Sequence, residues 1–254
     1  MKINYVIASW GGPRHGYADS LTVLKYHIEK LQTLTHNISQ VTIGYPQCNW
    51  ESKEYTNYIY DLECKGKLSD NTKLEIFKTN NYGMSYGQYG RIFRRYRNQF
   101  DAYIIVEDDY IPTLPNLDTA LYNMMQEQNV GYLCGLCMNE SGKYGAIAPE
   151  HAAISNGIIS TSCLEAVLDK FGVIPSVTGD NQPSQITFSQ AVIKSGQKIG
   201  DYVESGKYRC TFWDHMLIRI YGKSPLLRDI FVPYQYAISP AMLVYRYIKK
   251  WPTS

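Results

Sequence analysis

The chain has 254 residues, of which 44% are hydrophobic and 19% are charged, and its formal net charge is +2. This composition excludes a disordered chain, and the small net charge gives no electrostatic reason to expect nucleic-acid binding. A chain of this length forms one large α/β domain or two small ones, and it contains no apolar run of about 18 residues that would span a membrane.

The first half of the chain contains four predicted strands. The fourth is a wholly apolar run rich in β-branched residues, as expected for a strand buried on both faces. The predicted strands are residues 2–8, 40–44, 74–78 and 102–106.

Helices are predicted between these strands. Asp19 or Ser20 can cap a helix in which apolar residues recur at helical spacing: Leu21, Leu24, Ile28 and Leu31. Residues 86–100 are also predicted to be helical and lead into the fourth strand. This alternation favours a doubly wound, largely parallel sheet.

The second half has a mixed pattern. We expect strands at 130–138 and 154–160 and helices at 117–128, 163–171 and 186–195. The segment 175–185 is expected to be an exposed loop. The basic, aromatic segment 236–251 is expected to be a surface helix or a packed tail rather than a membrane anchor. The whole pattern predicts an α/β fold with a mixed, mostly parallel central sheet flanked by helices.

The six cysteines do not form a metal-binding pattern. Cys134 and Cys137 make a C-x-x-C, but they lie in a predicted strand, and no second such pair or nearby histidine pair completes a zinc site. We expect buried free thiols. Since no signal peptide is evident, the expected location is the cytoplasm.

Three consecutive acids, Glu107, Asp108 and Asp109, follow the predicted strand 102–106. In open α/β sheets, ligands bind outside the carboxyl ends of the strands. Three carboxylates there repel one another unless a cation lies between them, and a divalent metal carrying a phosphorylated substrate is the simplest occupant. The alternative is a solvated acidic turn.

This strand with its acids resembles the D-x-D motif of GT-A-fold nucleotide-sugar glycosyltransferases, in the frame Glu107-x-Asp109. Upstream, the Asn-x-Gly of Asn81 and Gly83 resembles the turn that opens a helix lining the donor pocket of these enzymes. Arg91, further along that segment, would contact a phosphate. The alternative for this segment is a flexible loop before a helix.

Three pieces resemble the N-acetylglucosaminyltransferase I family more specifically. They are V-E-D-D at 106–109, M-N-E-S-G at 138–142 and F-W-D-H-M at 212–216, and they follow the family's order. The chain departs from the family at His215, where the family has a second aspartate, and in a longer segment between the second and third pieces.

The resemblance implies roles for the acids. Asp109 would bind Mn²⁺ or Mg²⁺, Glu107 would contact the donor sugar, and Asp108 the ribose or a metal-bound water. Asp214 would be the general base of an inverting transfer, and it is equally a candidate helix N-cap. His215 would add a metal or diphosphate ligand, or it is a histidine satisfied by its neighbours on a helix.

Other residues complete the expected site. The stretch 9–16, with Ser9 and Arg14, follows the first strand, where GT-A proteins hold the base and diphosphate. Asn139 and Trp213 lie in the second and third family pieces and would face the acceptor. The glycines of 11–16 also faintly resemble the signature of sugar nucleotidyltransferases, but the Pro-Lys pair of that signature is missing.

The expected function is metal-dependent transfer of a sugar from a nucleoside-diphosphate sugar to a hydroxyl of a glycan, glycoprotein or glycolipid, with inversion. The expected organisation is a single GT-A-type domain spanning 1–254, with a donor half at 1–112 and an acceptor half at 113–254. The alternatives are a sugar-phosphate nucleotidyltransferase and a non-catalytic carbohydrate-binding protein on a transferase scaffold.

Overall fold

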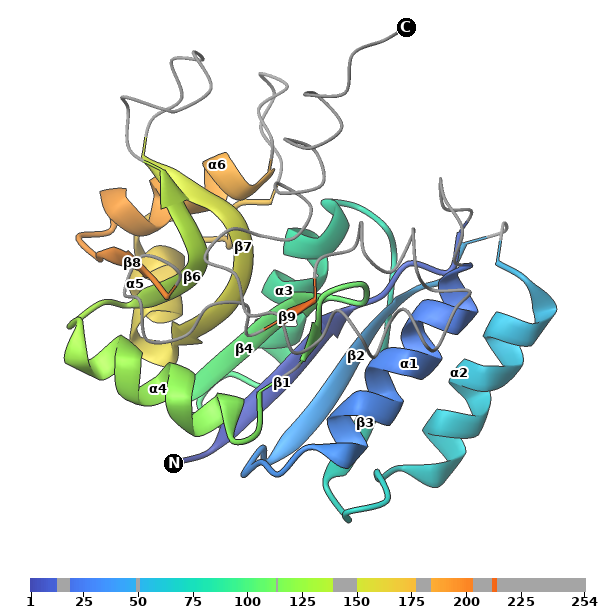
Figure 1. Ribbon diagram of the computed structural model, residues 1–254. Helices are drawn as coiled ribbons and strands as arrows, with labels where there is room; N and C mark the ends of the chain where they lie inside the picture. Colours follow the sequence, from blue (N-terminus) through green and yellow to red (C-terminus); the bar gives the residue numbers. More distant parts are fainter. Residues whose placement is uncertain are drawn as a thin grey trace, which may run out of the picture.

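The structure is a computed structural model, and it describes residues 1–12, 19–48, 51–112, 114–138, 150–176, 184–202 and 212–213. These residues form a central sheet with helices on both faces (Figure 1). A second, two-stranded sheet lies beside it.

The central sheet has seven strands in the order β3-β2-β1-β4-β7-β6-β8. Their bounds are Ile3–Ala8 for β1, Gln40–Pro46 for β2, Lys73–Thr79 for β3, Ala102–Glu107 for β4, Tyr132–Met138 for β6, His151–Ser160 for β7 and Ile199–Asp201 for β8. Strands β3, β2, β1 and β4 pair in parallel, as do β6 and β8, whereas β7 is antiparallel to both of its neighbours. The predicted mixed, mostly parallel sheet is therefore confirmed.

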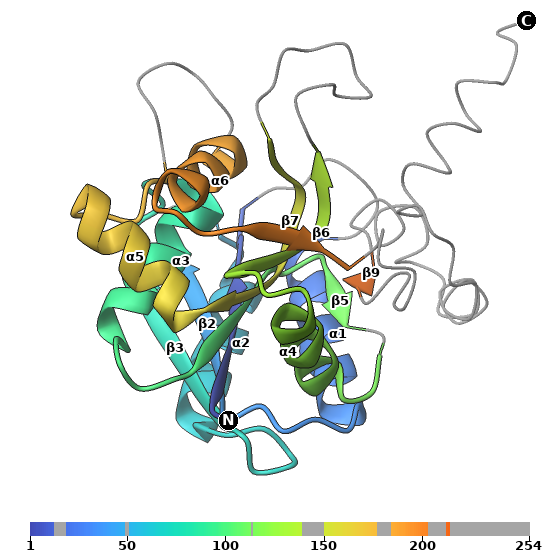
Figure 2. The same ribbon diagram turned by 90° about the vertical axis from the view of Figure 1, so that its left-hand side faces the viewer.

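Within the described residues, six helices cover the two faces of the sheet. One face carries α1 (Ser20–Thr33), α2 (Lys53–Lys65) and α4 (Leu117–Glu127). The other carries α3 (Met84–Arg95), α5 (Thr161–Phe171) and α6 (Ser184–Lys194), as Figure 2 shows from the side.

Alternation along β1 divides the core into two layers. Tyr5 and Ile7 pack into the cluster under α1, α2 and α4, whereas Val6 and Ala8 pack into the cluster under α3, α5 and α6. All of β1 is buried, since a strand covered on both faces has no solvent side. The apolar runs that predicted the strands reflect this double burial.

Capping residues set the ends of the helices on the first face. The Asp19 carboxylate accepts from the N–H of Thr22 at 2.8 Å, which confirms the predicted cap of α1. Helix α2 was not expected, although Ser52 caps its start and Gly66, with φ 61°, ends it.

Some predicted bounds need correction. The helix expected at 86–100 begins earlier and ends at Arg95, because Tyr96 leaves the helical region and Asn98 has φ 64°. The short strand β8 was not expected either, because its three residues carry no alternating pattern.

Among the described cysteines, all of which are free, Cys134 and Cys163 are buried and Cys64 is exposed. The expectation of buried thiols therefore holds for only part of the set. Cys210 lies outside the described residues.

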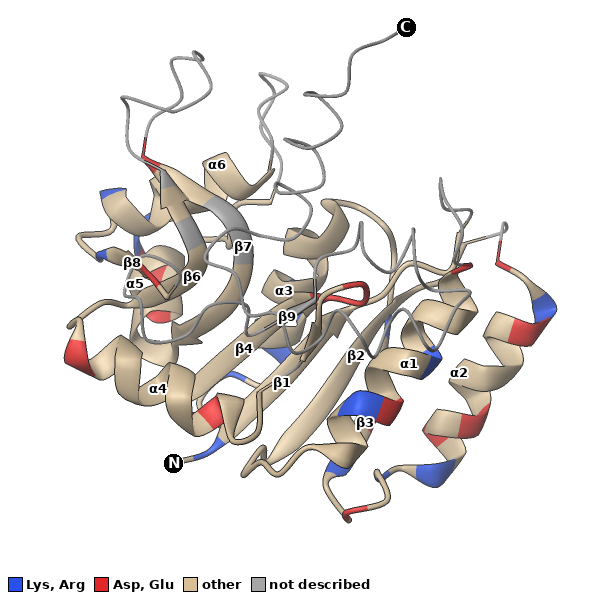
Figure 3. Ribbon diagram, viewed as in Figure 1, with Lys and Arg blue, Asp and Glu red and all other residues tan. Residues whose placement is uncertain are grey.

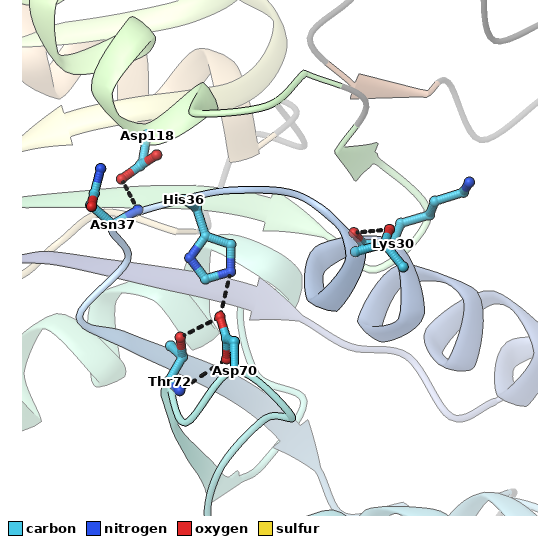
Figure 4. A network of polar contacts seen from close by, with 7 residues as sticks. Lys30, His36, Asn37, Asp70, Thr72 and Asp118 are labelled. Atoms are coloured by element: carbon cyan, nitrogen blue, oxygen red, sulfur yellow. Dashed lines mark hydrogen bonds and ion pairs between the residues drawn. The ribbon is translucent and has the colours of Figure 1, made fainter.

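Polar contacts fasten the edge of the sheet where the parallel strands begin (Figure 4). The His36 ring lies 3.2 Å from an Asp70 carboxylate oxygen, and Asp70 also accepts from the N–H and hydroxyl of Thr72. The N–H of Asn37 donates to Asp118 at the start of α4. These contacts tie together the loops that precede β2 and β3, leaving the opposite edge for a ligand.

Strand order places a crevice at that opposite edge. The chain runs from β1 through α1 to β2 on one side of β1, and from β3 through α3 to β4 on the other side. The order of the strands therefore reverses between β1 and β4, and ligands bind at this kind of switch point in doubly wound sheets. Among the described residues, no helix is both long and apolar enough to cross a bilayer.

Candidate functional site

A cleft of about 410 Å³ opens at the carboxyl ends of β1 and β4. Its lining comes from three places in the chain: the end of β1, the turn after β4, and the start of α3 with the loop before it. The lining residues are Ala8, Ser9, Trp10, Asn81, Met84, Ser85, Gln88, Glu107, Asp108 and Asp109. The cleft therefore lies at the switch point of the sheet.

The three acids occupy a tight turn at the end of β4, coloured red in Figure 3. The turn is closed by a hydrogen bond of 3.1 Å from the N–H of Tyr110 to the carbonyl of Glu107. Asp108 and Asp109 are 2% and 7% exposed. A solvated acidic turn would leave these carboxylates exposed, so the burial argues against that alternative.

Asp108 is fixed from three directions. Its carboxylate Oδ2 accepts from the N–H of Trp10 at 2.9 Å, and its own N–H donates to the carbonyl of Ala8 at 3.1 Å. Its carbonyl accepts from Nδ1 of His27 at 2.8 Å. Asp108 thus joins the loop after β1 to the turn after β4.

The neighbouring carboxylates face the start of α3. The Ser85 hydroxyl donates to Oε1 of Glu107 at 2.9 Å. Tyr89, one turn further along α3, is almost fully buried, and burial raises the pKa of its hydroxyl well above the usual value. The charges of Glu107, Asp108 and Asp109 raise it further, so Tyr89 lies beside the acids as a neutral phenol.

The β1 wall of the cleft is held by Ser9. Both its N–H and its hydroxyl donate to the carbonyl of Gly44 in β2, at 3.1 and 2.7 Å. Its carbonyl accepts from Nε2 of Gln88 at 3.2 Å. A Cβ at Gly44 would lie 2.3 Å from Oε1 of Gln88, so glycine at this point makes room for that side chain.

The loop before α3 has a defined conformation rather than a flexible one. Gly83 has φ 79° and immediately precedes α3, and the N–H of Met84 donates to the carbonyl of Asn81 at 3.3 Å. The Arg91 guanidinium donates to the carbonyls of Tyr82 and Asn80, each at 2.9 Å. Arg91 therefore fastens this loop, and it is not among the described lining residues.

The donor set of the cleft suits a metal that arrives with its substrate. Within the described residues, no three Asp, Glu, His or Cys side chains converge as a metal cage. Mg²⁺ in nucleotide sites is bound by one or two carboxylates together with substrate phosphates and water, and Asp109 and Glu107 fit that requirement.

A two-stranded sheet brings a distant segment to the acidic turn. Strand β5 (Ile111–Pro112) pairs antiparallel with β9 (Phe212–Trp213), and Ile111 lies opposite Trp213. Neither strand was predicted. The pairing places the backbone of Trp213 opposite Ile111, which follows Asp109 by two residues. It thereby brings together two of the three pieces on which the family resemblance rests.

The structure brings together five of the predicted site residues in one cleft: Ser9, Asn81, Glu107, Asp108 and Asp109. Gly83 and Arg91 instead shape the adjoining loop. Four predicted residues lie outside the described part of the chain: Arg14, Asn139, Asp214 and His215.

Sequence reasoning missed Trp10, Met84, Ser85 and Gln88, which also line the cleft. Ser85 and Gln88 lie three positions apart, which places them on one side of α3, and this spacing within the recognised segment was an available signal. His27 gave no signal, because its contact with Asp108 spans 81 positions.

Comparisons with known proteins show little similarity. No family model and no curated protein matches the chain, so neither supports the resemblance to the N-acetylglucosaminyltransferase I family. A solved 4-diphosphocytidyl-2C-methyl-D-erythritol synthase from Anaerococcus prevotii DSM 20548 is 10% identical, with a TM-score of 0.46 over 79% of this chain and 86% of that chain. A second structure of such a synthase is 9% identical, with a TM-score of 0.44 over 79% and 87%.

Proposed function

We propose that the protein is a metal-dependent transferase that binds a nucleoside-diphosphate sugar in this cleft and transfers the sugar to a hydroxyl acceptor. One observation carries the proposal. Among the residues that the structure describes, the lining of the cleft contains three acids and no lysine, arginine or histidine. A phosphorylated ligand can approach such a lining only with a cation between the two sets of negative charges.

The contacts of the three acids suggest a division of roles. The Asp108 carboxylate is engaged by the backbone of Trp10, so it holds the site together. Asp109 is the proposed metal ligand, and Glu107, oriented by Ser85, faces the donor sugar or the metal. Mn²⁺ or Mg²⁺ at this point would neutralise the charge that develops on the diphosphate leaving group.

The pairing of β5 with β9 supports sugar transfer. Asp214 follows Trp213 directly in the sequence, and Trp213 lies opposite Ile111 just after the acids. We propose Asp214 as the base that takes the proton of the acceptor hydroxyl, with His215 as an additional metal or diphosphate ligand. Asn139 and Trp213 are proposed for the acceptor side, and Ser9, Arg14 and Asn81 for the donor.

Nucleotidyl transfer is the second candidate. Ser9 and Trp10 form one wall of the cleft, and the glycine-rich stretch 11–16 continues from them. The two solved structures are named as synthases of a diphosphocytidyl compound, which is nearer to this candidate than to sugar transfer. Their TM-scores below 0.5 are too low to discriminate between the two reactions.

Product analysis discriminates between the candidates. The protein is incubated with Mn²⁺ and a panel of nucleoside-diphosphate sugars, and separately with nucleoside triphosphates and sugar phosphates. Sugar transfer, or slow donor hydrolysis without an acceptor, releases a nucleoside diphosphate in the first set. Release of pyrophosphate in the second set would establish nucleotidyl transfer instead, and binding without any product would indicate a non-catalytic protein.

A further inference from the structure

A buried chain of two hydrogen bonds lies directly behind the acidic turn. The Tyr5 hydroxyl lies 2.9 Å from Nε2 of His27, and Nδ1 of His27 lies 2.8 Å from the carbonyl oxygen of Asp108. Tyr5 and His27 are both fully buried. The chain connects the middle of β1, through α1, to the end of β4.

The chemistry of the partners fixes the ring. A carbonyl oxygen only accepts, so Nδ1 of His27 must carry the proton, and Nε2 of the neutral ring must then accept from the Tyr5 hydroxyl. Tyr5 and His27 also meet edge to face, with ring centroids 5.8 Å apart. The ring therefore has one orientation and one tautomer.

The position of the carbonyl in the turn gives this contact a consequence for the site. Asp108 lies between Glu107 and Asp109, the two carboxylates proposed for the metal and the sugar. Asp108 also bonds to Ala8 at the end of β1 and to Trp10 in the loop that follows, whereas the His27 bond holds the peptide unit that leads into Asp109. Rotation of that peptide unit would turn the Asp109 side chain.

We propose that His27, held by Tyr5, is a positioning residue of the metal site: it anchors the carbonyl of Asp108 and thereby orients the Asp109 carboxylate. This inference rests on the proposed metal-dependent function. It goes beyond that function, because His27 lies outside the lining of the cleft and acts only through the backbone.

Two amide variants of His27 test the positioning role in the full-length protein. His27→Asn keeps an amide N–H near the place of Nδ1, and His27→Gln instead puts its amide near Nε2. The readout is Mn²⁺ affinity, measured with the metal alone and again with each of a panel of nucleoside diphosphates, from the free-ion electron paramagnetic resonance signal well below each variant's melting temperature. We expect His27→Gln to weaken Mn²⁺ binding by about 10-fold, as is common for residues that orient metal ligands, and His27→Asn to restore most of the affinity.

The outcomes separate the inference from the function. If the wild type binds Mn²⁺ and the two variants have the same affinity as each other, whether unchanged or equally reduced, the positioning role is wrong while the proposed function stands. If the wild type binds no Mn²⁺, either alone or with any nucleoside diphosphate of the panel, the proposed function fails and the inference falls with it. Tyr5→Phe removes only the hydroxyl oxygen and replaces the His27 variants in the test if those do not fold. About threefold weaker Mn²⁺ binding by Tyr5→Phe supports the positioning role, and unchanged Mn²⁺ affinity contradicts it.

Discussion

The backbone N–H of Trp10 donates to the buried carboxylate of Asp108 over 2.9 Å, and this bond joins the loop after β1 to the turn after β4 at the switch point of the sheet. All three acids line the cleft, but Asp108 also holds the scaffold together, whereas Glu107 and Asp109 are the acids proposed for the sugar and the metal.

Truncation of Asp108 is expected to destabilise the fold. Asp108→Ala leaves the N–H of Trp10 without this acceptor in a partly buried position, which costs about 1 kcal/mol of unfolding free energy. Asp108→Asn keeps an acceptor oxygen and should cost less. Denaturant unfolding measures both, with Asp101→Ala as the control, since the Asp101 contact with Lys2 at the other end of β4 is exposed. Equal stability of Asp108→Ala and Asp101→Ala would contradict the scaffold role.

Loss of the Ser85 hydroxyl should affect ligand binding more than stability. Ser85→Ala removes the hydroxyl that donates a hydrogen bond to Glu107. Because a hydrogen bond to a charged group is lost, we expect the Mn²⁺-dependent affinity for the nucleotide sugar to fall by roughly 10-fold. Ser85→Thr retains the hydroxyl and is the matched control. Calorimetric titration provides the comparison, and indistinguishable affinities for the two variants would show that Ser85 does not orient Glu107.

Substitution of Gly83 is expected to lower the unfolding free energy more than substitution of Gly172, another glycine with positive φ. A Cβ at Gly83 would lie 2.5 Å from the Ser176 hydroxyl oxygen, whereas a Cβ at Gly172, with φ 67°, meets nothing within 4 Å. Gly172→Ala should therefore cost only the left-handed conformation, about 1–2 kcal/mol. Gly83→Ala should lower the unfolding free energy further, and thermal unfolding of the two variants decides. A smaller effect at Gly83 would contradict the described loop.

The buried state of His27 predicts how stability depends on pH. Burial lowers its pKa from 6.5 to about 4, against the opposing influence of Asp108. Between these values the unfolded chain binds a proton that the folded protein does not, so stability falls as pH drops from about 6.5 to about 4. The loss from this group amounts to about 3 kcal/mol.

Unfolding free energies of wild type and His27→Asn over this pH range test that expectation. Acidic groups titrate in both proteins, so the difference between the two profiles isolates the histidine. The wild type should lose more stability on acidification than the variant. Parallel profiles would show that His27 is not held neutral.

Three of the four strands of the first half, β1, β2 and β4, could be predicted because they are buried on both faces, whereas β3 at the sheet edge alternates between buried and more exposed residues. A run such as 102–106 has no solvent side, and its continuous apolar character is therefore visible in the sequence. The cap at Asp19 was readable for a similar reason, since it depends on a residue only three positions away. Helix α2 had readable signals as well, in the Ser52 cap and the buried residues Tyr55, Ile59 and Leu62, but the half-buried Tyr58 and the exposed Tyr60 obscure the pattern.

Contacts between distant segments could not be predicted in this way. Arg91 was expected at a phosphate because it is a cation beside glycines, but its planar group meets two backbone carbonyls whose position depends on the folded loop. The Tyr5–His27–Asp108 chain and the β5–β9 pair likewise depend on tertiary packing. The acids themselves were identified correctly as cleft residues, because their place at the end of a strand is a local property.

The most direct test of the central claim is calorimetric titration of the protein with a panel of nucleoside-diphosphate sugars, with and without Mn²⁺. Wild type and Asp101→Asn should bind one donor only when Mn²⁺ is present. Asp109→Asn should weaken that binding by about 100-fold or more, since even residues that only orient metal ligands commonly cost 10- to 100-fold. Binding that is independent of the metal, absent from the wild type, or unchanged in Asp109→Asn would contradict the account.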